Sequence, residues 1–267
     1  MKITANYHTH TYRCGHAIGD DESFVKGAIE LGLKVLGFSD HVPLKGINST
    51  NMRQDYTMIE DYVKSISNLK DKYKDQIDIL IGYECEYIEE YLDEYKDLLK
   101  NKGIQYLICG QHCYVDNNEQ IFYNSSYHNH EMITKYADAI CAAIKSGLFA
   151  YIAHPDHFMN GYRIWDEFAI EQSRKILSCA SKYKVPLEIN VAGIRFSEDK
   201  HKKNAEGNPI ENMYPHEKFW ELASEYDVKG IIGIDAHRKE DFLDKEEENA
   251  MELAKKYNID LVSKLDI

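Results

Sequence analysis

The chain has 267 residues, which fits one large domain or two small ones. Hydrophobic residues make up 43% of it, with only 15 Gly and 5 Pro, so the composition excludes a mainly disordered or fibrous protein. The formal net charge of −13 repels a phosphate backbone and excludes general nucleic-acid binding.

The first residues, Met1 to Tyr7, are typical of a strand and lack the basic and apolar regions of a secretion signal. No stretch approaches the roughly 18 apolar residues needed to cross a bilayer. The sequence therefore predicts a cytoplasmic protein without a membrane partner. The 6 cysteines form no Cys-x-x-Cys pair, and we interpret them as buried free thiols rather than disulfides.

Short apolar runs with the length of buried strands recur along the chain. Near-continuous hydrophobicity of this kind is typical of parallel strands that are covered on both faces. The predicted strands are Ile3–Tyr7, Val35–Phe38, Ile77–Tyr83, Tyr106–Cys109, Phe149–Ala153, Pro186–Ile189 and Gly230–Ile234.

The segments between these runs repeat apolar residues at helical spacing, and several end at a glycine suited to terminating a helix. The predicted helices are Asp20–Gly32, Asp55–Tyr73, Glu89–Lys102 and Met132–Gly147. Alternating strands and helices favour a parallel sheet with right-handed crossovers. No Pro/Gly/Ser-rich linker interrupts the alternation, so we expect residues 1–267 to form one α/β domain of the TIM-barrel type.

Two later segments have a distinct composition. Arg195 to Pro215 is polar and irregular, and it is either a loop over a site or a surface insertion. The run Arg238–Tyr257 is dense in charge but keeps apolar residues at Phe242, Leu243 and Met251. This pattern indicates a helix with a solvated face rather than a partner-binding motif.

Residue types that bind metals follow most of the predicted strands. In chain order they are His8-Thr9-His10, Asp40-His41, Glu84, Gln111-His112, His154-Pro155-Asp156 and Asp235-Ala236-His237. Because the carboxyl ends of parallel barrel strands open on one rim, we expect these side chains to converge there. Imidazole and carboxylate ligands suit zinc, iron or manganese better than magnesium or calcium. The sequence therefore predicts a metal site at this rim.

Other histidines do not follow strands. His128 and His130 have the same spacing of two residues but lie in a polar stretch before a helix, so we do not expect them to bind metal. His157, His201 and His216 fall in predicted loops and are interpreted as surface or supporting groups, with His157 the strongest candidate for an exception.

The motifs together resemble the polymerase-and-histidinol-phosphatase (PHP) superfamily and, within it, the monofunctional histidinol-phosphate phosphatases. The segments that carry the resemblance are His8-Thr9-His10, His16, Ser39-Asp40-His41, Gly82-Tyr83-Glu84, Gln111-His112, Ala153-His154-Pro155 and Ile234-Asp235-Ala236-His237. The resemblance implies a distorted (β/α)₇ barrel that holds three divalent metal ions of zinc, iron or manganese.

The resemblance also implies how the ligands are divided. One metal is expected on His8, His10, Glu84 and Asp235, and Glu84 bridges to a second metal on His112 and His154. The third is expected on His16, His41 and His237. Only the resemblance identifies His16, because this residue lies in a loop beyond the first strand.

The subfamily assignment depends on fewer residues. The segment Pro186 to Arg195 is similar to the sixth-strand segment of histidinol-phosphate phosphatases, which ends in a phosphate-contacting arginine. Arg163 falls where a second such arginine is expected, and the alternative for both is an ordinary surface arginine. The small polar residue common in the family near Val191 and Ala192 is absent.

The implied reaction is hydrolysis of L-histidinol phosphate to L-histidinol and phosphate, in histidine biosynthesis, by attack of a metal-bridging hydroxide. Glu84 and Asp235 act through the metals, and Arg163 and Arg195 contact the phosphate. The leaving alcohol needs a proton donor, for which Asp156 and His157 are the candidates beside His154.

Three alternatives stay open at this level. The same chemistry serves a PHP phosphoesterase acting on a nucleotide, a sugar phosphate or phosphotyrosine. An amidohydrolase barrel also begins with His-x-His, but no lysine follows the strand ending at Glu84 or Gln111. A non-catalytic PHP module of a polymerase is disfavoured because such modules lose ligands, whereas this chain has the complete set.

Overall fold

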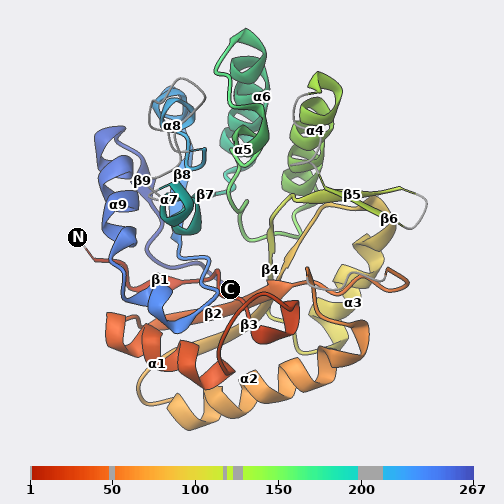
Figure 1. Cartoon of the computed structure of the whole chain (residues 1–267), viewed down its shortest axis with the longest axis vertical. Helices are drawn as coiled ribbons and strands as arrows, with labels where there is room; N and C mark the ends of the chain where they lie inside the picture. Colours follow the sequence, from red (N-terminus) through yellow and green to blue (C-terminus); the bar gives the residue numbers. More distant parts are fainter. Residues whose placement is uncertain (1, 48–51, 117–118, 123–128, 198–212) are drawn as a thin grey trace.

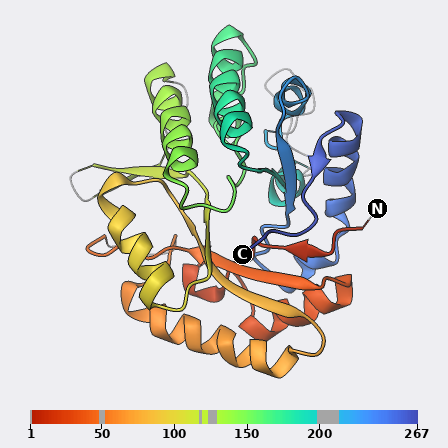
Figure 2. The same ribbon diagram turned by 180° about the vertical axis from the view of Figure 1, so that it is seen from behind.

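The structure is a computed structural model that describes residues 2–47, 52–116, 119–122, 129–197 and 213–267. Its strands form a curled parallel sheet surrounded by helices (Figure 1, Figure 2). The parallel strands are β1 (Ala5–Asn6), β2 (Val35–His41), β3 (Asp78–Cys85), β4 (Tyr106–Cys109), β7 (Leu187–Asn190), β8 (Lys229–Gly233) and β9 (Asp260–Leu261). They pair in the orders β1-β2-β3-β4 and β7-β8-β9.

Isolated bridges join these two groups into a distorted barrel. Ile152 pairs in parallel with Cys109 of β4 and with Leu187 of β7, so the predicted fifth strand, Phe149–Ala153, is represented by two isolated bridges at one residue. The backbone turns into a left-handed conformation at His154 directly afterwards, with φ 29, which ends the pairing. On the other side, Thr9 pairs with Ala236 and closes the barrel at the carboxyl ends of β1 and β8.

The predicted helices form close to the expected positions. In α1 (Asp21–Leu31), the Asp20 side chain accepts the Ser23 backbone N–H at the start, and Gly32 ends the helix with φ 95. Short 3₁₀ turns, Tyr56–Met58 and Glu89–Tyr91, precede two of the helices. The other helices are α2 (Ile59–Tyr73), α3 (Leu92–Asn101), α4 (His130–Ser146), α5 (Met159–Tyr162), α6 (Glu167–Tyr183), α7 (Val191–Ser197), α8 (Glu217–Ala223) and α9 (Glu246–Lys256).

Some elements differ from the sequence prediction. The antiparallel hairpin of β5 (Cys113–Asp116) and β6 (Glu119–Phe122) was not expected. The irregular segment that begins at Arg195 starts inside α7, and residues 198–212 of it lie outside the described residues. The charged run after Arg238 splits into a 3₁₀ turn (Lys239–Phe242) and α9.

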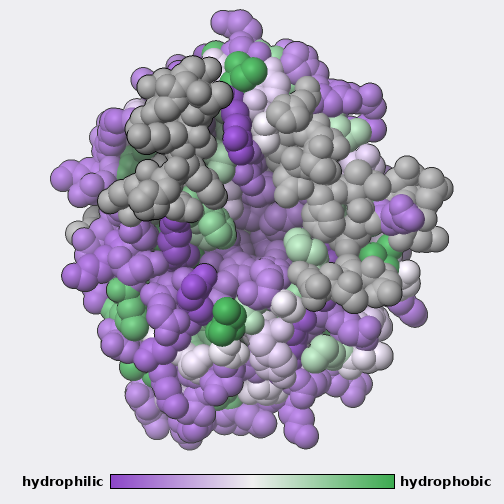
Figure 3. Space-filling model, viewed as in Figure 1, coloured by the Kyte–Doolittle hydropathy of each residue, from purple (hydrophilic) through white to green (hydrophobic). Residues whose placement is uncertain are grey.

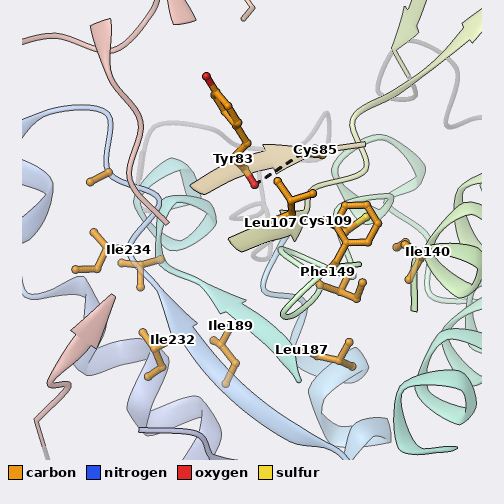
Figure 4. Packing of buried hydrophobic residues seen from close by; sticks show 14 of the residues in the cluster. Tyr83, Cys85, Leu107, Cys109, Ile140, Phe149, Leu187, Ile189, Ile232 and Ile234 are labelled. Atoms are coloured by element: carbon orange, nitrogen blue, oxygen red, sulfur yellow. Dashed lines mark hydrogen bonds between the residues drawn. The ribbon is translucent and has the colours of Figure 1, made fainter. Parts of the chain in front are cut away.

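The strands present two faces with different packing. Their outward side chains pack against the helices, as Ile189, Ile232 and Leu107 do in Figure 4. The inward side chains of Val35, Leu80, Tyr106, Tyr151 and Ile231 fill the barrel interior. Side chains alternate along a strand, so Glu84 faces inward like Leu80, four residues before it on β3. The apolar interior thus ends in a polar layer at the carboxyl ends of the strands.

All 6 cysteines are buried and free, as predicted. Among the described residues, no helix combines the length and the apolar character needed to cross a membrane.

Candidate metal centre

Glu84 lies at the centre of a histidine cluster at the carboxyl ends of the strands. Its Oε1 is 2.9 Å from His154 Nε2 and 3.5 Å from His112 Nε2. Its Oε2 is 3.1 Å from His41 Nδ1 and 3.5 Å from His10 Nε2. One carboxylate thus faces imidazoles from β2 and from the loops that follow β1, β4 and Ile152.

A glycine makes room for this carboxylate. A Cβ atom at Gly110, just beyond β4, would lie 1.8 Å from Glu84 Oε1. Any larger residue at this position would displace Glu84, so the close approach of β4 to the carboxylate requires glycine.

The floor of the centre consists of buried ligand types, namely His8, His10, Glu84, His154 and Asp235. Asp235 Oδ1 lies 3.1 Å from His10 Nε2 and 3.5 Å from His8 Nε2, and His8 Nε2 lies 3.4 Å from Glu84 Oε1. Both His154 and Asp235 have positive φ, at 29 and 51. Such strained backbone in non-glycine residues is found mainly where a site requires a particular side-chain direction.

The rim of the centre consists of the more exposed His16 and His237. Their Nε2 atoms are 3.0 Å apart. The His41 and His10 rings lie beside this pair, with the His10 ring centroid 4.1 Å from that of His237 and 4.4 Å from that of His41. His16, which strand position did not identify, therefore joins the cluster.

Carboxylates behind the imidazoles orient several of the rings. His8 Nδ1 donates to Glu188 Oε2 at 2.8 Å, and Asp40 Oδ1 lies 3.5 Å from His10 Nδ1. Glu86 Oε1 lies 3.3 Å from His112 Nδ1. A carboxylate on one ring nitrogen leaves the other nitrogen available as a metal ligand. Sequence reasoning missed Glu188 and Glu86 in this role, although Glu188 stands out as a charged residue in an apolar run.

Asn190 connects the carboxylate of Glu188, behind His8, with that of Asp235 on the floor. Its Nδ2 donates to Glu188 Oε1 at 2.7 Å and to Asp235 Oδ2 at 3.1 Å. Since Asp235 Oδ2 is taken, its Oδ1 is the oxygen that faces His8 and His10.

The electrostatics of the cluster follow from burial and from the carboxylates. Burial raises the pKa of Glu84, but the imidazoles of His112, His8 and His41 outweigh it and hold this pKa well below its usual range. Burial lowers the pKa of His10, but Asp235 and Asp40 raise it to about 9. The Glu84 carboxylate and the His10 imidazole therefore carry opposite charges when no cation lies between them.

The donor set fits metal ions. Among the described residues, His8 Nε2, Glu84 Oε2 and Asp235 Oδ1 are buried atoms without a hydrogen-bond partner. Burying such groups unpaired is costly, and a cation between them would satisfy all of them. Candidate ligand groups with mutually close atoms include His8–His10–Glu84, His41–Glu84–His112 and His10–His41–His237, and two further groups contain Cys14, with His16 and His237 or with His10 and Asp40. These groups overlap the expected three-part division and share members with one another.

A cavity of ≈ 570 Å³ opens above the cluster. Its lining includes ligand residues of the floor and the rim, together with His157, Arg195 and Tyr214. The face seen in Figure 1 has a hollow near its centre with mostly hydrophilic walls (Figure 3). A small polar substrate can reach the histidines through this opening.

The remaining predicted site residues separate into two groups. Arg195 lines the cavity, whereas Arg163 is exposed, donates its Nε to Asn160 O at 3.2 Å and does not line it. Asp156 is buried away from the cavity lining, where its Oδ2 accepts the His216 backbone N–H at 2.5 Å. Burial raises the pKa of this carboxyl to about 7.

The histidines outside the predicted ligand set also separate. His157 is buried and lines the cavity. His130 starts α4 and stacks on Phe168 at 3.9 Å, and His216 stacks on Trp165 at 5.0 Å, away from the cluster. His128 and His201 lie outside the described residues.

The fold and the site define an α/β barrel protein with a cluster of imidazole and carboxylate ligands for divalent metal at the carboxyl ends of its strands. The chain belongs to the PHP domain family, whose model matches residues 6–192.

Named relatives and solved structures agree with this assignment. The chain is 24% identical over 238 residues to a probable histidinol-phosphatase of Deinococcus radiodurans, covering 86% of this chain and 85% of the relative. It is 26% identical over 271 residues to a probable histidinol-phosphatase of Schizosaccharomyces pombe, covering 89% and 81%. A histidinol phosphate phosphatase from Lactococcus lactis, solved with zinc, L-histidinol and phosphate, has a TM-score of 0.75 at 18% identity over 100% of both chains. This structural likeness confirms the distorted barrel fold.

Proposed function

We propose that this chain is a metal-dependent phosphomonoesterase that hydrolyses L-histidinol phosphate to L-histidinol and phosphate, a step of histidine biosynthesis. The observation that carries the proposal is the convergence of unpartnered ligand atoms from His8, Glu84 and Asp235 beneath an open cavity. The names of the Deinococcus radiodurans and Schizosaccharomyces pombe relatives support the substrate. We further propose that residues 1–267 form a single PHP domain.

We propose that the centre holds three divalent ions of zinc, iron or manganese. His8, His10, Glu84 and Asp235 would hold the first, and Glu84, His112 and His154 the second. His16, His41 and His237 would hold the third. Bound ions would supply positive charge for the phosphoryl oxygens and lower the pKa of a bound water.

The chain's own residues bind and orient the substrate. Arg195 donates to Ile234 O and Asp241 O, each at 2.8 Å, and pairs with Asp244 through its Nε. A guanidinium has five N–H groups, so one on each terminal nitrogen remains for phosphate oxygens. Because its other bonds fix its direction, Arg195 is positioned for phosphate before the substrate arrives.

His157 is the better placed of the two candidate donors for the leaving group. It lines the cavity, whereas the Asp156 carboxylate is engaged by the His216 backbone. We therefore propose that His157 donates a hydrogen bond from a ring N–H to the departing alcohol oxygen, and that Asp156 supports the His216 segment.

A panel of phosphate monoesters, assayed for released phosphate together with elemental analysis of the purified protein, tests these proposals. We expect L-histidinol phosphate to have the highest kcat/KM and the protein to contain about three metal equivalents, as the ligand set implies. A nucleotide, a sugar phosphate or phosphotyrosine as the best substrate would assign another phosphoesterase activity. A protein that binds metal but hydrolyses no ester would support a non-catalytic module.

A further inference from the structure

A second arginine lines the cavity beside Arg195. Arg238 follows the rim residue His237 directly in the chain and lies at the start of the 3₁₀ turn Lys239–Phe242. Its side chain is 59% exposed, so its guanidinium is accessible to a ligand in the cavity.

The backbone at this position is fixed by one carboxylate. Asp241 Oδ2 accepts the backbone N–H groups of His237 at 2.8 Å and of Arg238 at 3.1 Å. The backbone N–H groups of the rim ligand and of the arginine are therefore held by the same acceptor.

The guanidinium of Arg238 has little to hold it within the described part of the chain. Its Nε lies 3.6 Å from Asp241 Oδ1, which is longer than a hydrogen bond. Arg195, in contrast, has a donor group on each of its three nitrogens engaged by Asp244, Ile234 O or Asp241 O. Arg238 thus has more of its donors available than Arg195 does.

Arg163 is held differently from the two arginines that line the cavity. It ends α5 with a left-handed backbone, φ 55, and its Nε donates to the carbonyl oxygen of Asn160 within the same turn. Its side chain does not line the cavity above the metal centre.

We propose that Arg238 is a phosphate-binding residue of this site, providing a guanidinium alongside Arg195. The inference rests on the proposed phosphomonoesterase function. Arg195 supplies donors whose direction is fixed, and Arg238 supplies a mobile guanidinium that closes on the outer oxygens of the phosphoryl group. Paired arginines suit phosphate because the planar guanidinium matches the spacing of its oxygens.

Calorimetric titration of the metal-loaded protein with inorganic phosphate tests the inference. We expect Arg238→Ala to raise the Kd for phosphate by about tenfold or more, the scale of losing a charge-assisted hydrogen-bonded pair. Arg238→Lys should recover part of the affinity because it keeps the charge but loses the fork. Arg174→Ala, which removes an exposed arginine paired with Glu225 outside the cavity lining, is the matched control and should leave the Kd unchanged.

Elemental analysis of the same samples separates binding from support of the neighbouring ligand. Unchanged metal content with weaker phosphate binding supports the inference. Unchanged phosphate affinity in Arg238→Ala, an equal loss in Arg174→Ala, or a loss that goes with release of metal would each overturn it. The titration uses phosphate alone, so failure of every ester in the substrate panel would refute the proposed function and leave this result standing.

Discussion

The floor and the rim of the candidate metal centre both use imidazole ligands, but different groups lie behind the rings in the two regions. On the floor, the His8 side chain is fully buried, and Glu188 accepts a hydrogen bond from its Nδ1. At the rim, His237 is 26% exposed, and its Nδ1 lies 3.2 Å from the backbone oxygen of Asp235 and 3.4 Å from the carboxylate Oδ1 of the same residue. His16 Nδ1 similarly faces Cys14 O at 3.2 Å.

This difference bears on how tightly each region binds a cation. A carboxylate behind an imidazole makes the ring a stronger ligand and fixes its direction, whereas a carbonyl carries only a partial charge. Two floor carboxylates, Glu84 and Asp235, also face the cation directly, but the rim pair consists of neutral rings. We therefore expect tight binding on the floor and faster exchange at the rim.

The largest expected effect is that of Glu84→Ala. It removes the carboxylate shared by the ligand groups proposed for the first and the second metal. We therefore expect loss of about two metal equivalents and no measurable turnover, because metal-assisted hydrolysis depends on those ions. Elemental analysis and phosphate release measure both. Glu131→Ala, on the exposed surface of α4, is the control and should match the parent. Near-normal metal content in Glu84→Ala would contradict a bridging position.

Removal of a rim ligand should have a smaller and more local effect. In His16→Ala we expect loss of about one metal equivalent with the floor ions retained, because His16 has no floor carboxylate as a partner. Activity should fall but return in part when the assay contains excess metal. His130→Ala, which removes a ring stacked on Phe168, is the control. Loss of all ions from His16→Ala would show that floor and rim bind as one unit.

Glu188→Gln tests the support of the floor without removing a ligand. The change keeps the size of the side chain but removes the charge behind His8, so we expect metal affinity on the floor to fall about 10- to 100-fold. Competition with a chelator measures this affinity. Glu225→Gln, in an exposed ion pair with Arg174, is the matched control. An unchanged floor affinity would mean that Glu188 serves only packing.

The ligands of the floor were easier to predict from the sequence than the carboxylates that lie behind them. Apolar runs locate strands because buried parallel strands are hydrophobic on both faces, and ligands such as Glu84 and His154 stand out where the runs end. Contacts between Glu188 and His8, 180 residues apart, depend on which inward positions meet across the barrel. The spacing of residues in one sequence does not contain that information.

Other differences have local causes. The predicted strand Phe149–Ala153 forms two isolated bridges through Ile152, and the chain turns sharply at His154 just beyond it. Asp156 looked suited to catalysis by its position after His154, but the His216 backbone N–H recruits its carboxylate. Arg163 and Arg238 differ in whether the turn that holds them faces the cavity, and composition does not reveal such a direction.

Graded removal of metal tests the difference in cation binding between the floor and the rim most mildly, since it changes no residue. With limited dipicolinate, we expect about one equivalent to leave quickly from the exposed rim and the rest slowly from the buried floor, because carboxylate-rich sites bind divalent ions more tightly. Metal released over time, followed with a colorimetric indicator, should therefore show two phases. His16→Ala should lack the fast phase, and Glu188→Gln should speed only the slow one. A single phase in the parent protein would mean that the carboxylates behind the floor imidazoles do not separate the two regions.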